Sequence, residues 1–398
     1  MTRTTRNNLT LLTLGLVLSI AGCSGHQTRA DAKNAAQERW GSARANISYS
    51  LAEQQFEVGD LDKAEKTVNE AISTHPDDPR YYDLSARIAM ERGQLERAYR
   101  LLEHSISLDE ERHESHYLHG VVQQRWQRYE PALESYEQAF AHRPDEPAAL
   151  LAVAEMLVKL DRVDEAVERL EERLAYFANN AAIRTGIGRI HMMKHNYAKA
   201  VTAFREASVL SPEDQNIREL LALAAFADEQ YGEVIRLLAG MLSDDANKDR
   251  VDLKIVLADA FMATENPVEA RRIFLSITQE DPNDVNAWIK LAQASWMVGD
   301  DPRLTQATAR VIALAPRRHE GYLLRGMAEH RKGEADAAIA SFERASELAP
   351  SNTLPLILKG MTKEQAGDSD GAVAAYRAAL AIEPDDRRAQ ELLAGVAE

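Results

Sequence analysis

Seven prolines of this 398-residue chain fall on one grid with a step of 34 residues, and this periodicity constrains the fold more than any other feature. They are Pro76, Pro144, Pro212, Pro282, Pro316, Pro350 and Pro384. The interval from Pro212 to Pro282 is 70 residues, two more than a double step, and the acidic stretch 243–249 is the expected place of the insertion. A period in this range indicates an array of small structural repeats rather than ordinary globular domains.

Other residue types keep the same step. Small residues such as Ala64 lie twelve positions before the proline position, and bulky residues such as Val68 follow four positions later. Gly59 and its equivalents form a third column, and a glycine there can end a first helix in the left-handed conformation. Acidic residues such as Asp62 then suit the start of a second helix, which the proline stops. The predicted unit is therefore helix, turn, helix, stop.

This unit closely resembles the tetratricopeptide repeat. The resemblance covers Ala45 to Asp386 as ten repeats, which begin at residues 45, 79, 113, 147, 181, 215, 251, 285, 319 and 353. It implies an all-α fold, a right-handed superhelical solenoid of about ten hairpins. Residues 387–398 are expected to form a capping helix, because solenoid ends need a polar cover. Residues 23–44 are expected to be a tether or a capping segment, with Trp40 as its contact to the first repeat.

The N-terminus predicts export. Arg3 and Arg6 precede an apolar run at 11–20, which is too short to span a bilayer but suits a signal peptide covering residues 1–22. Ile20-Ala21-Gly22-Cys23 resembles the lipobox of bacterial lipoproteins, in which the cysteine is acylated. By that resemblance, Ser24 favours sorting to the outer membrane. We therefore expect a protein anchored through Cys23 to the outer membrane and facing the periplasm.

The amino-acid composition narrows the classes of binding partner that are expected. The formal net charge of −16 repels nucleic-acid phosphates and anionic lipid surfaces, so attachment to the membrane is expected through lipid alone. Cys23 is the one cysteine, which excludes an internal disulfide. No cofactor, metal or small-molecule substrate is expected. The expected partners are other proteins.

The resemblance to tetratricopeptide arrays also implies a binding groove. Its wall would come from the second, fifth, ninth, twelfth and thirteenth positions of each repeat, many of which are apolar here. The candidate groove residues are Tyr49, Phe56, Met90, Tyr117, Met192, Met193, Phe226, Met262, Trp296, Met297, Met327 and Met361. Methionine adapts to varied partners, so the segment from Met192 to Met361 is predicted to form a soft apolar strip. The alternative is that these side chains are core, buried against neighbouring helices.

Motifs that carry chemistry are weak. His113, His116 and His119 are three residues apart and could share a helix face that binds a metal, although structural roles are favoured. His191 and His195 have the spacing of a zinc-protease helix but lack its glutamate. Gly186-Ile187-Gly188 has no preceding strand that would make it a phosphate loop. The lysine and asparagine pair that chaperone-type members use to clamp a C-terminal carboxylate is absent.

The sequence therefore predicts a non-catalytic scaffold or adaptor of the Gram-negative envelope. Lipid-anchored tetratricopeptide proteins resembling this one support the assembly of pili, polysaccharide-export systems or secretion complexes. One alternative is an adaptor that recruits peptidoglycan enzymes. The other is a metal-dependent enzyme centred on His113, His116 and His119.

Overall fold

A computed structural model describes residues 29–397, and all regular structure in this range is helical. The predicted signal peptide at residues 1–22, Cys23 and Ser24 lie outside the described residues. The first six helices are α1 (Arg29–Glu57), α2 (Leu61–Thr74), α3 (Pro79–Glu91), α4 (Leu95–Leu108), α5 (His113–Arg125) and α6 (Tyr129–His142). The next eight are α7 (Pro147–Lys159), α8 (Val163–Arg173), α9 (Ala181–Met193), α10 (Tyr197–Leu210), α11 (Gln215–Ala227), α12 (Tyr231–Leu242), α13 (Val251–Ala263) and α14 (Pro267–Glu280). The last seven are α15 (Val285–Val298), α16 (Asp301–Leu314), α17 (His319–Arg331), α18 (Ala335–Leu348), α19 (Leu354–Gln365), α20 (Ser369–Ile382) and α21 (Arg387–Ala397).

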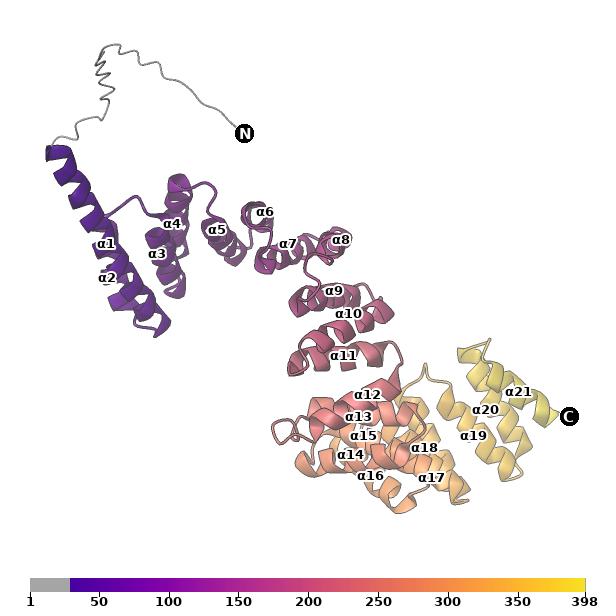
Figure 1. Cartoon of the computed structure of the whole chain (residues 1–398). Coiled ribbons are helices and arrows are strands. Elements are labelled where there is room, and N and C mark those ends of the chain that lie inside the picture. Colours follow the sequence, from indigo (N-terminus) through magenta and orange to yellow (C-terminus); the bar gives the residue numbers. More distant parts are fainter. Residues whose placement is uncertain (1–28, 398) are drawn as a thin grey trace, which may run out of the picture. The chain divides into compact units, whose positions relative to one another are not determined.

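Consecutive helices pair as hairpins, as Figure 1 shows, which confirms the expected all-helical repeat architecture. The chain divides into two compact units, residues 1–145 and 146–398. The described part of the first unit holds helices α1 to α6, and that of the second holds α7 to α21.

Every hairpin turns through one residue in the left-handed conformation. Five turns use the predicted glycine column, for example Gly59 with a φ of 80°. The other five place a non-glycine residue there with φ between 56° and 62°: Gln127, Asp161, His195, Glu229 and Glu265. A side chain in this conformation costs about 1–2 kcal/mol, so these five turns are held in place by the helix packing around them. The repeat geometry is thus kept even where the sequence lacks the residue that favours it.

The core of each hairpin forms where the small and bulky columns meet. Ala200 and Ala338 are fully buried between the helices of their hairpins. Where a helix carries glycine at the eighth position of the repeat, an aromatic ring fills the space: a Cβ on Gly188 would lie 2.6 Å from the Phe204 ring. Gly120 faces Tyr136 and Gly326 faces Phe342 in the same way. In these hairpins the missing side chain at the eighth position of the repeat is therefore matched by a large aromatic side chain in the bulky column.

The two ends of the array differ from each other. Helix α1 starts at Arg29, well before the position at which the later first helices begin, so the segment from 29 to 44 is helical. Trp40 was expected to contact the first repeat, and this was wrong, because its side chain is 74% exposed. The buried face of α1 is formed by Ala45 and Ala52, roughly opposite Trp40 on the helix. At the C-terminal end, α21 buries Ala389 against the last hairpin.

Candidate binding groove

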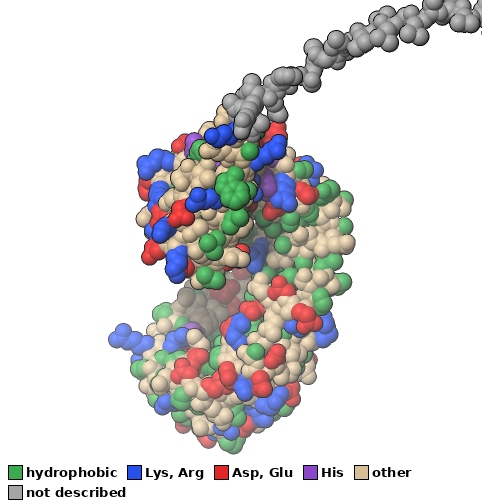
Figure 2. Space-filling model, turned by 60° about the vertical axis from the view of Figure 1, so that its left-hand side comes forward, with side chains coloured by type: hydrophobic (Ala, Val, Ile, Leu, Met, Phe, Trp, Pro, Cys, Tyr) green, Lys and Arg blue, Asp and Glu red, His purple; other side chains and the backbone are tan. Residues whose placement is uncertain are grey.

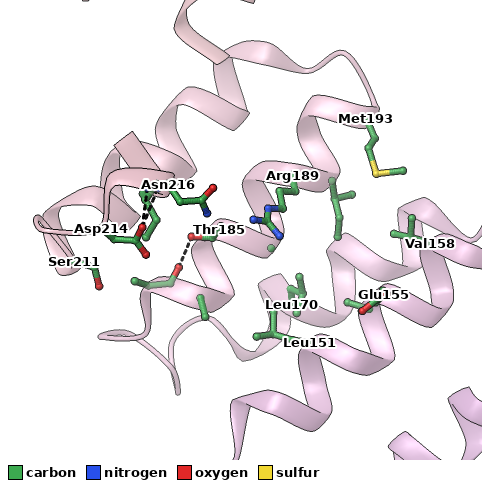
Figure 3. A pocket seen from close by; sticks show the side chains of 16 residues that line it. Leu151, Glu155, Val158, Leu170, Thr185, Arg189, Met193, Ser211, Asp214 and Asn216 are labelled. Atoms are coloured by element: carbon green, nitrogen blue, oxygen red, sulfur yellow. Dashed lines mark hydrogen bonds between the residues drawn. The ribbon is translucent and has the colours of Figure 1, made fainter. Parts of the chain in front are cut away.

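The second unit contains a cavity of about 570 Å³ between helices α7, α8, α9 and the start of α11. Helix α7 contributes Leu151, Glu155 and Val158 to its wall, and α9 contributes Thr185, Arg189 and Met193 (Figure 3). In the repeat numbering these are the fifth, ninth and twelfth positions of the fourth repeat and the fifth, ninth and thirteenth of the fifth. Groove positions of the fourth and fifth repeats therefore lie around one cavity, and of the twelve predicted groove residues Met193 lines it.

Small side chains open the space between the helices. Gly186 lies in α9 between two leucines, and a Cβ there would approach Leu151 Cδ2 to 3.0 Å and Leu170 Cδ1 to 3.2 Å. Ala154, Ala181 and Ala182 contribute further short side chains to the lining. The glycine pair at 186 and 188 is therefore used for helix packing and for the cavity, not for a phosphate loop.

The polar side chains at the cavity differ in whether they already have hydrogen-bond partners. The Thr185 hydroxyl donates to the Ala181 carbonyl at 2.8 Å, and the Asp214 carboxylate accepts the Asn216 and Ile217 amides at 2.9 and 3.3 Å, which caps α11. Arg189 is exposed and reaches into the cavity (Figure 3). Among residues 29–397 it has no hydrogen-bond or ion-pair partner. The arrangement offers an apolar hollow beside one uncommitted guanidinium group.

The candidate groove residues divide by exposure. Met193 lines the cavity and is 56% exposed, while Trp296 and Met297 on α15 are 37% and 43% exposed. Most of the others are half-buried and pack onto hydrophobic clusters of neighbouring hairpins: Tyr49, Phe56, Met192, Phe226, Met262, Met327 and Met361. Tyr117 is half-buried, with its ring 5.3 Å from that of Tyr136.

Met90 was placed wrongly in the groove. It is 6% exposed and belongs to the core cluster formed by α3, α4 and α5. The reason is local: Met90 packs among side chains of α4 and α5, whereas Val158 and Trp296, at the same twelfth position of their repeats, stay more open. Thirteenth-position residues, rotated by about 100° on the helix, stay open in Met193 and Met297.

Sequence reasoning missed Thr185, Arg189 and Glu155, because residues were selected for apolar character. The fifth and ninth repeat positions, which those residues occupy, would have been the signal that finds them.

The three histidines of the metal alternative have different partners. His113 Nε2 lies 2.9 Å from Arg143 Nη1, His116 Nε2 lies 2.9 Å from the Glu110 carbonyl, and His119 Nδ1 lies 3.0 Å from Ser135 Oγ. The His119 ring also lies against Tyr99, with 4.6 Å between centroids. Within residues 29–397, no group of three or more His, Cys, Asp or Glu side chains is arranged to hold a metal ion. The three histidines are therefore not grouped as a metal site.

The second histidine pair is also separated. His191 is 4% exposed, and His195 occupies the left-handed turn position, with its Nδ1 2.6 Å from the Tyr197 hydroxyl. Burial lowers the pKa of His191, which lies 3.6 Å from a Glu171 carboxylate oxygen.

In the described part of the chain, no helix has both the length and the hydrophobicity required to cross a bilayer.

Three solved structures illustrate what this chain is similar to. The C-terminal part of a TPR repeat-containing protein from Cytophaga hutchinsonii is 19% identical, with a TM-score of 0.48 over 61% of this chain and 99% of that one. PilF of Pseudomonas aeruginosa is 12% identical, with a TM-score of 0.45 over 51% and 92% of the two chains. Yeast Tom70 is 14% identical, with a TM-score of 0.41 over 88% of each chain. No curated protein sequence matches.

The sequence profile of the tetratricopeptide repeat matches residues 27–88, 127–190, 225–294 and 330–396, and a second profile of the same repeat matches residues 301–353. These matches cover more than half of the chain and fall on helical hairpins of both units. Arrays of this kind bind other proteins and are typically non-catalytic. The chain belongs to the tetratricopeptide repeat family.

Proposed function

We propose that the cavity between α7, α9 and α11 receives a segment of a partner protein, with an apolar side chain in the hollow and an acceptor oxygen on Arg189. The observation that carries this proposal is the uncommitted guanidinium of Arg189 beside the walls formed by Leu151, Val158 and Ile190. A carboxylate or a backbone carbonyl suits that group, because arginine offers several N–H donors and accepts nothing.

The lining favours binding over catalysis. Of its polar groups, Asp214 caps a helix and Thr185 bonds back to its own helix. No cysteine or histidine is among the described residues that line the cavity. An apolar hollow with a few polar groups that fix orientation is typical of a recognition site.

We further propose that this scaffold is anchored by lipid at Cys23 to the outer membrane and supports assembly of a pilus, a polysaccharide-export system or a secretion complex. The support is the basic start, the short apolar run and the Ile20–Cys23 motif. An adaptor that gathers peptidoglycan enzymes is the second candidate, since it would need the same anchor and the same kind of groove.

A photo-crosslinking amino acid at position 193, introduced in cells, tests the groove. We expect it to capture a partner that the same probe at position 209 does not. Val209 is a matched control, because it is 75% exposed on α10 and does not line the cavity. Equal capture at the two positions would contradict the proposal.

The captured segment is then synthesised and titrated against the purified chain. Loss of a charged hydrogen bond is worth about 1.5–3 kcal/mol, so Arg189→Ala should weaken binding roughly 10- to 100-fold. Arg344→Ala, on the exposed part of α18, should leave the affinity unchanged. An Arg189→Ala variant that binds the segment as well as the wild type does would remove the role assigned to this residue.

A further inference from the structure

The outer face of α1 carries an exposed apolar stripe. Trp40, Ile47, Leu51 and Val58 are 74%, 72%, 47% and 80% exposed. Their spacing of seven, four and seven residues places them on one side of the helix. Val58 follows directly after α1 and keeps the helical course, since its N–H donates to the Gln54 carbonyl at 3.1 Å. Figure 2 shows a line of hydrophobic side chains down the body of this unit, starting near the grey trace.

The stripe occupies a packing position of the repeat. Ile47 is the third residue of the first repeat, and the third residue is buried in the repeats that follow: Tyr81, Ser115, Ala149, Ile183, Ile217, Leu253, Ala287, Gly321 and Pro355. In those repeats, the third residue packs against the preceding hairpin. Ser115 Oγ lies 2.9 Å from Ser105 Oγ of α4, and a Cβ on Gly321 would approach Val311 of α16. No hairpin precedes α1 in the described part of the chain, so the same face is left open.

The other end of the array offers no matching surface. Helix α21 covers the last hairpin with Ala389 and Leu392, and its outer side exposes Arg387 and Glu391 at 90% and 65%. Head-to-tail stacking of two chains would therefore set an apolar stripe against charged side chains. A self-complementary contact between two α1 stripes avoids this mismatch.

The stripe is symmetric about its own centre. In an antiparallel pair, Trp40 of one copy meets Val58 of the other, and Ile47 meets Leu51. The large indole thus lies against a small side chain, and the two medium side chains meet at the middle. Each contact occurs twice, as a two-fold interface requires. The two Trp40 side chains would bury roughly 150–250 Å² each, and the six aliphatic side chains of the two stripes add to this, which brings the contact toward the roughly 1,000 Å² expected of a specific interface.

The distribution of charge along α1 also favours an antiparallel orientation of the two copies. Residues 29–48 contain four basic and two acidic side chains, whereas residues 49–60 contain three acidic and no basic ones. An antiparallel pair sets the basic half of each helix against the acidic half of its partner, while a parallel pair would set like against like. We propose that two copies of this chain pair through the Trp40–Val58 stripe in an antiparallel α1 to α1 contact.

Light scattering on the full chain with Cys23→Ala, which leaves no thiol and no acylation site, tests the assembly. The wild-type stripe should give twice the chain mass of 44.3 kDa. Leu51→Lys should give the single mass, because two lysines would then lie near the two-fold axis. Val268→Lys is the matched control, since Val268 is 53% exposed on α14 and should leave the dimer intact. Unchanged circular dichroism and melting of the fold show that each variant is folded.

Crosslinking fixes the direction. Positions 40 and 58 are about 27 Å apart along a helix, so a short thiol crosslinker should join a Trp40→Cys chain to a Val58→Cys chain and fail to join two Trp40→Cys chains. Reversal of these two results would overturn the antiparallel arrangement. A chain with the unchanged stripe that keeps the mass of one copy at high concentration would overturn the proposed dimer. This outcome would also be expected if residues 1–28 or a different protein covered α1.

Discussion

Gly188 provides a quantitative test of the size matching between helix pairs. An added Cβ would lie 2.6 Å from the Phe204 ring, about 1 Å inside the usual carbon–carbon contact of about 3.5–4.0 Å. Phe204 is fully buried, so the ring has no free space into which it can turn. Overpacking of this kind costs about 1–3 kcal/mol. Alanine gains about 1 kcal/mol over glycine in a helix interior. Because the overlap is with a fully buried ring, we take the upper part of the overpacking range, about 2–3 kcal/mol. Subtracting the gain of about 1 kcal/mol, we expect Gly188→Ala to lower the free energy of unfolding by about 1–2 kcal/mol.

The same hairpin offers a rescue. Other repeats pair alanine with leucine at these two columns, as Ala154 does with Leu170. Gly188→Ala combined with Phe204→Leu should therefore recover stability, with an interaction energy of at least about 1 kcal/mol between the two changes. Gly240→Ala is the control, because no atom lies within 4 Å of its Cβ position and only the helix-forming gain remains.

The measurement is urea unfolding followed by far-ultraviolet circular dichroism, together with hydrogen exchange of α9 and α10. Exchange is needed because repeats couple mainly to their neighbours, so one hairpin can open before the rest. A Gly188→Ala chain as stable as the wild type, or an additive double variant, would refute the packing argument. Repeat seven shows that an alanine and a phenylalanine can be packed together at these columns, because Ala258 and Phe274 are both fully buried there.

Four further outcomes are expected. Cys23→Ala should abolish labelling by a fatty-acid analogue and release the chain from membranes; label that survives would end the lipoprotein proposal. Ala338→Leu should cost about 1–3 kcal/mol by overpacking, which a single sharp and unshifted melting curve would contradict. Trp296→Ala should weaken partner capture by about 2 kcal/mol or more and destabilise the fold by less than the about 3–5 kcal/mol of a fully buried tryptophan. Burial lowers the pKa of His191, so the unfolded chain binds its proton first and stability falls as the pH drops below about 6.5; His191→Leu should make that fall shallower, and an unchanged slope would exclude this histidine as its source.

Much of the fold could be predicted, because repeat spacing is written into residues that act locally. A proline stops a helix and a glycine turns the chain whatever surrounds them. The first residues of α3, α5 and α7, namely Pro79, His113 and Pro147, are each 34 apart. Local signals did not cover every turn, however. Asp161 and His195 adopt the glycine conformation because the packed helices on both sides leave the chain no other course.

The candidate site could be predicted only in part, since exposure depends on a neighbouring hairpin. Met90 is the twelfth residue of its repeat and Met193 is the thirteenth residue of another. Met90 is buried in the core, whereas Met193 lines a cavity. Apolar character cannot separate them, because burial depends on which side chains of the neighbouring hairpin pack against each methionine. Arg189 was missed because it became a candidate through its lack of a hydrogen-bond or ion-pair partner within residues 29–397, and that depends on its surroundings rather than on its residue type.

The sequence by itself determined the repeat, the order of helix and turn, and the residues that meet between paired helices, since each follows from spacing and side-chain size along one stretch of chain. The tertiary structure alone decided which faces stay open. The cavity beside Gly186 is bounded by Leu151 and Leu170, which come from other helices, and the stripe from Trp40 to Val58 is exposed because no hairpin within residues 29–397 packs on that face of α1. Both depend on distances between helices, and no local pattern encodes those distances.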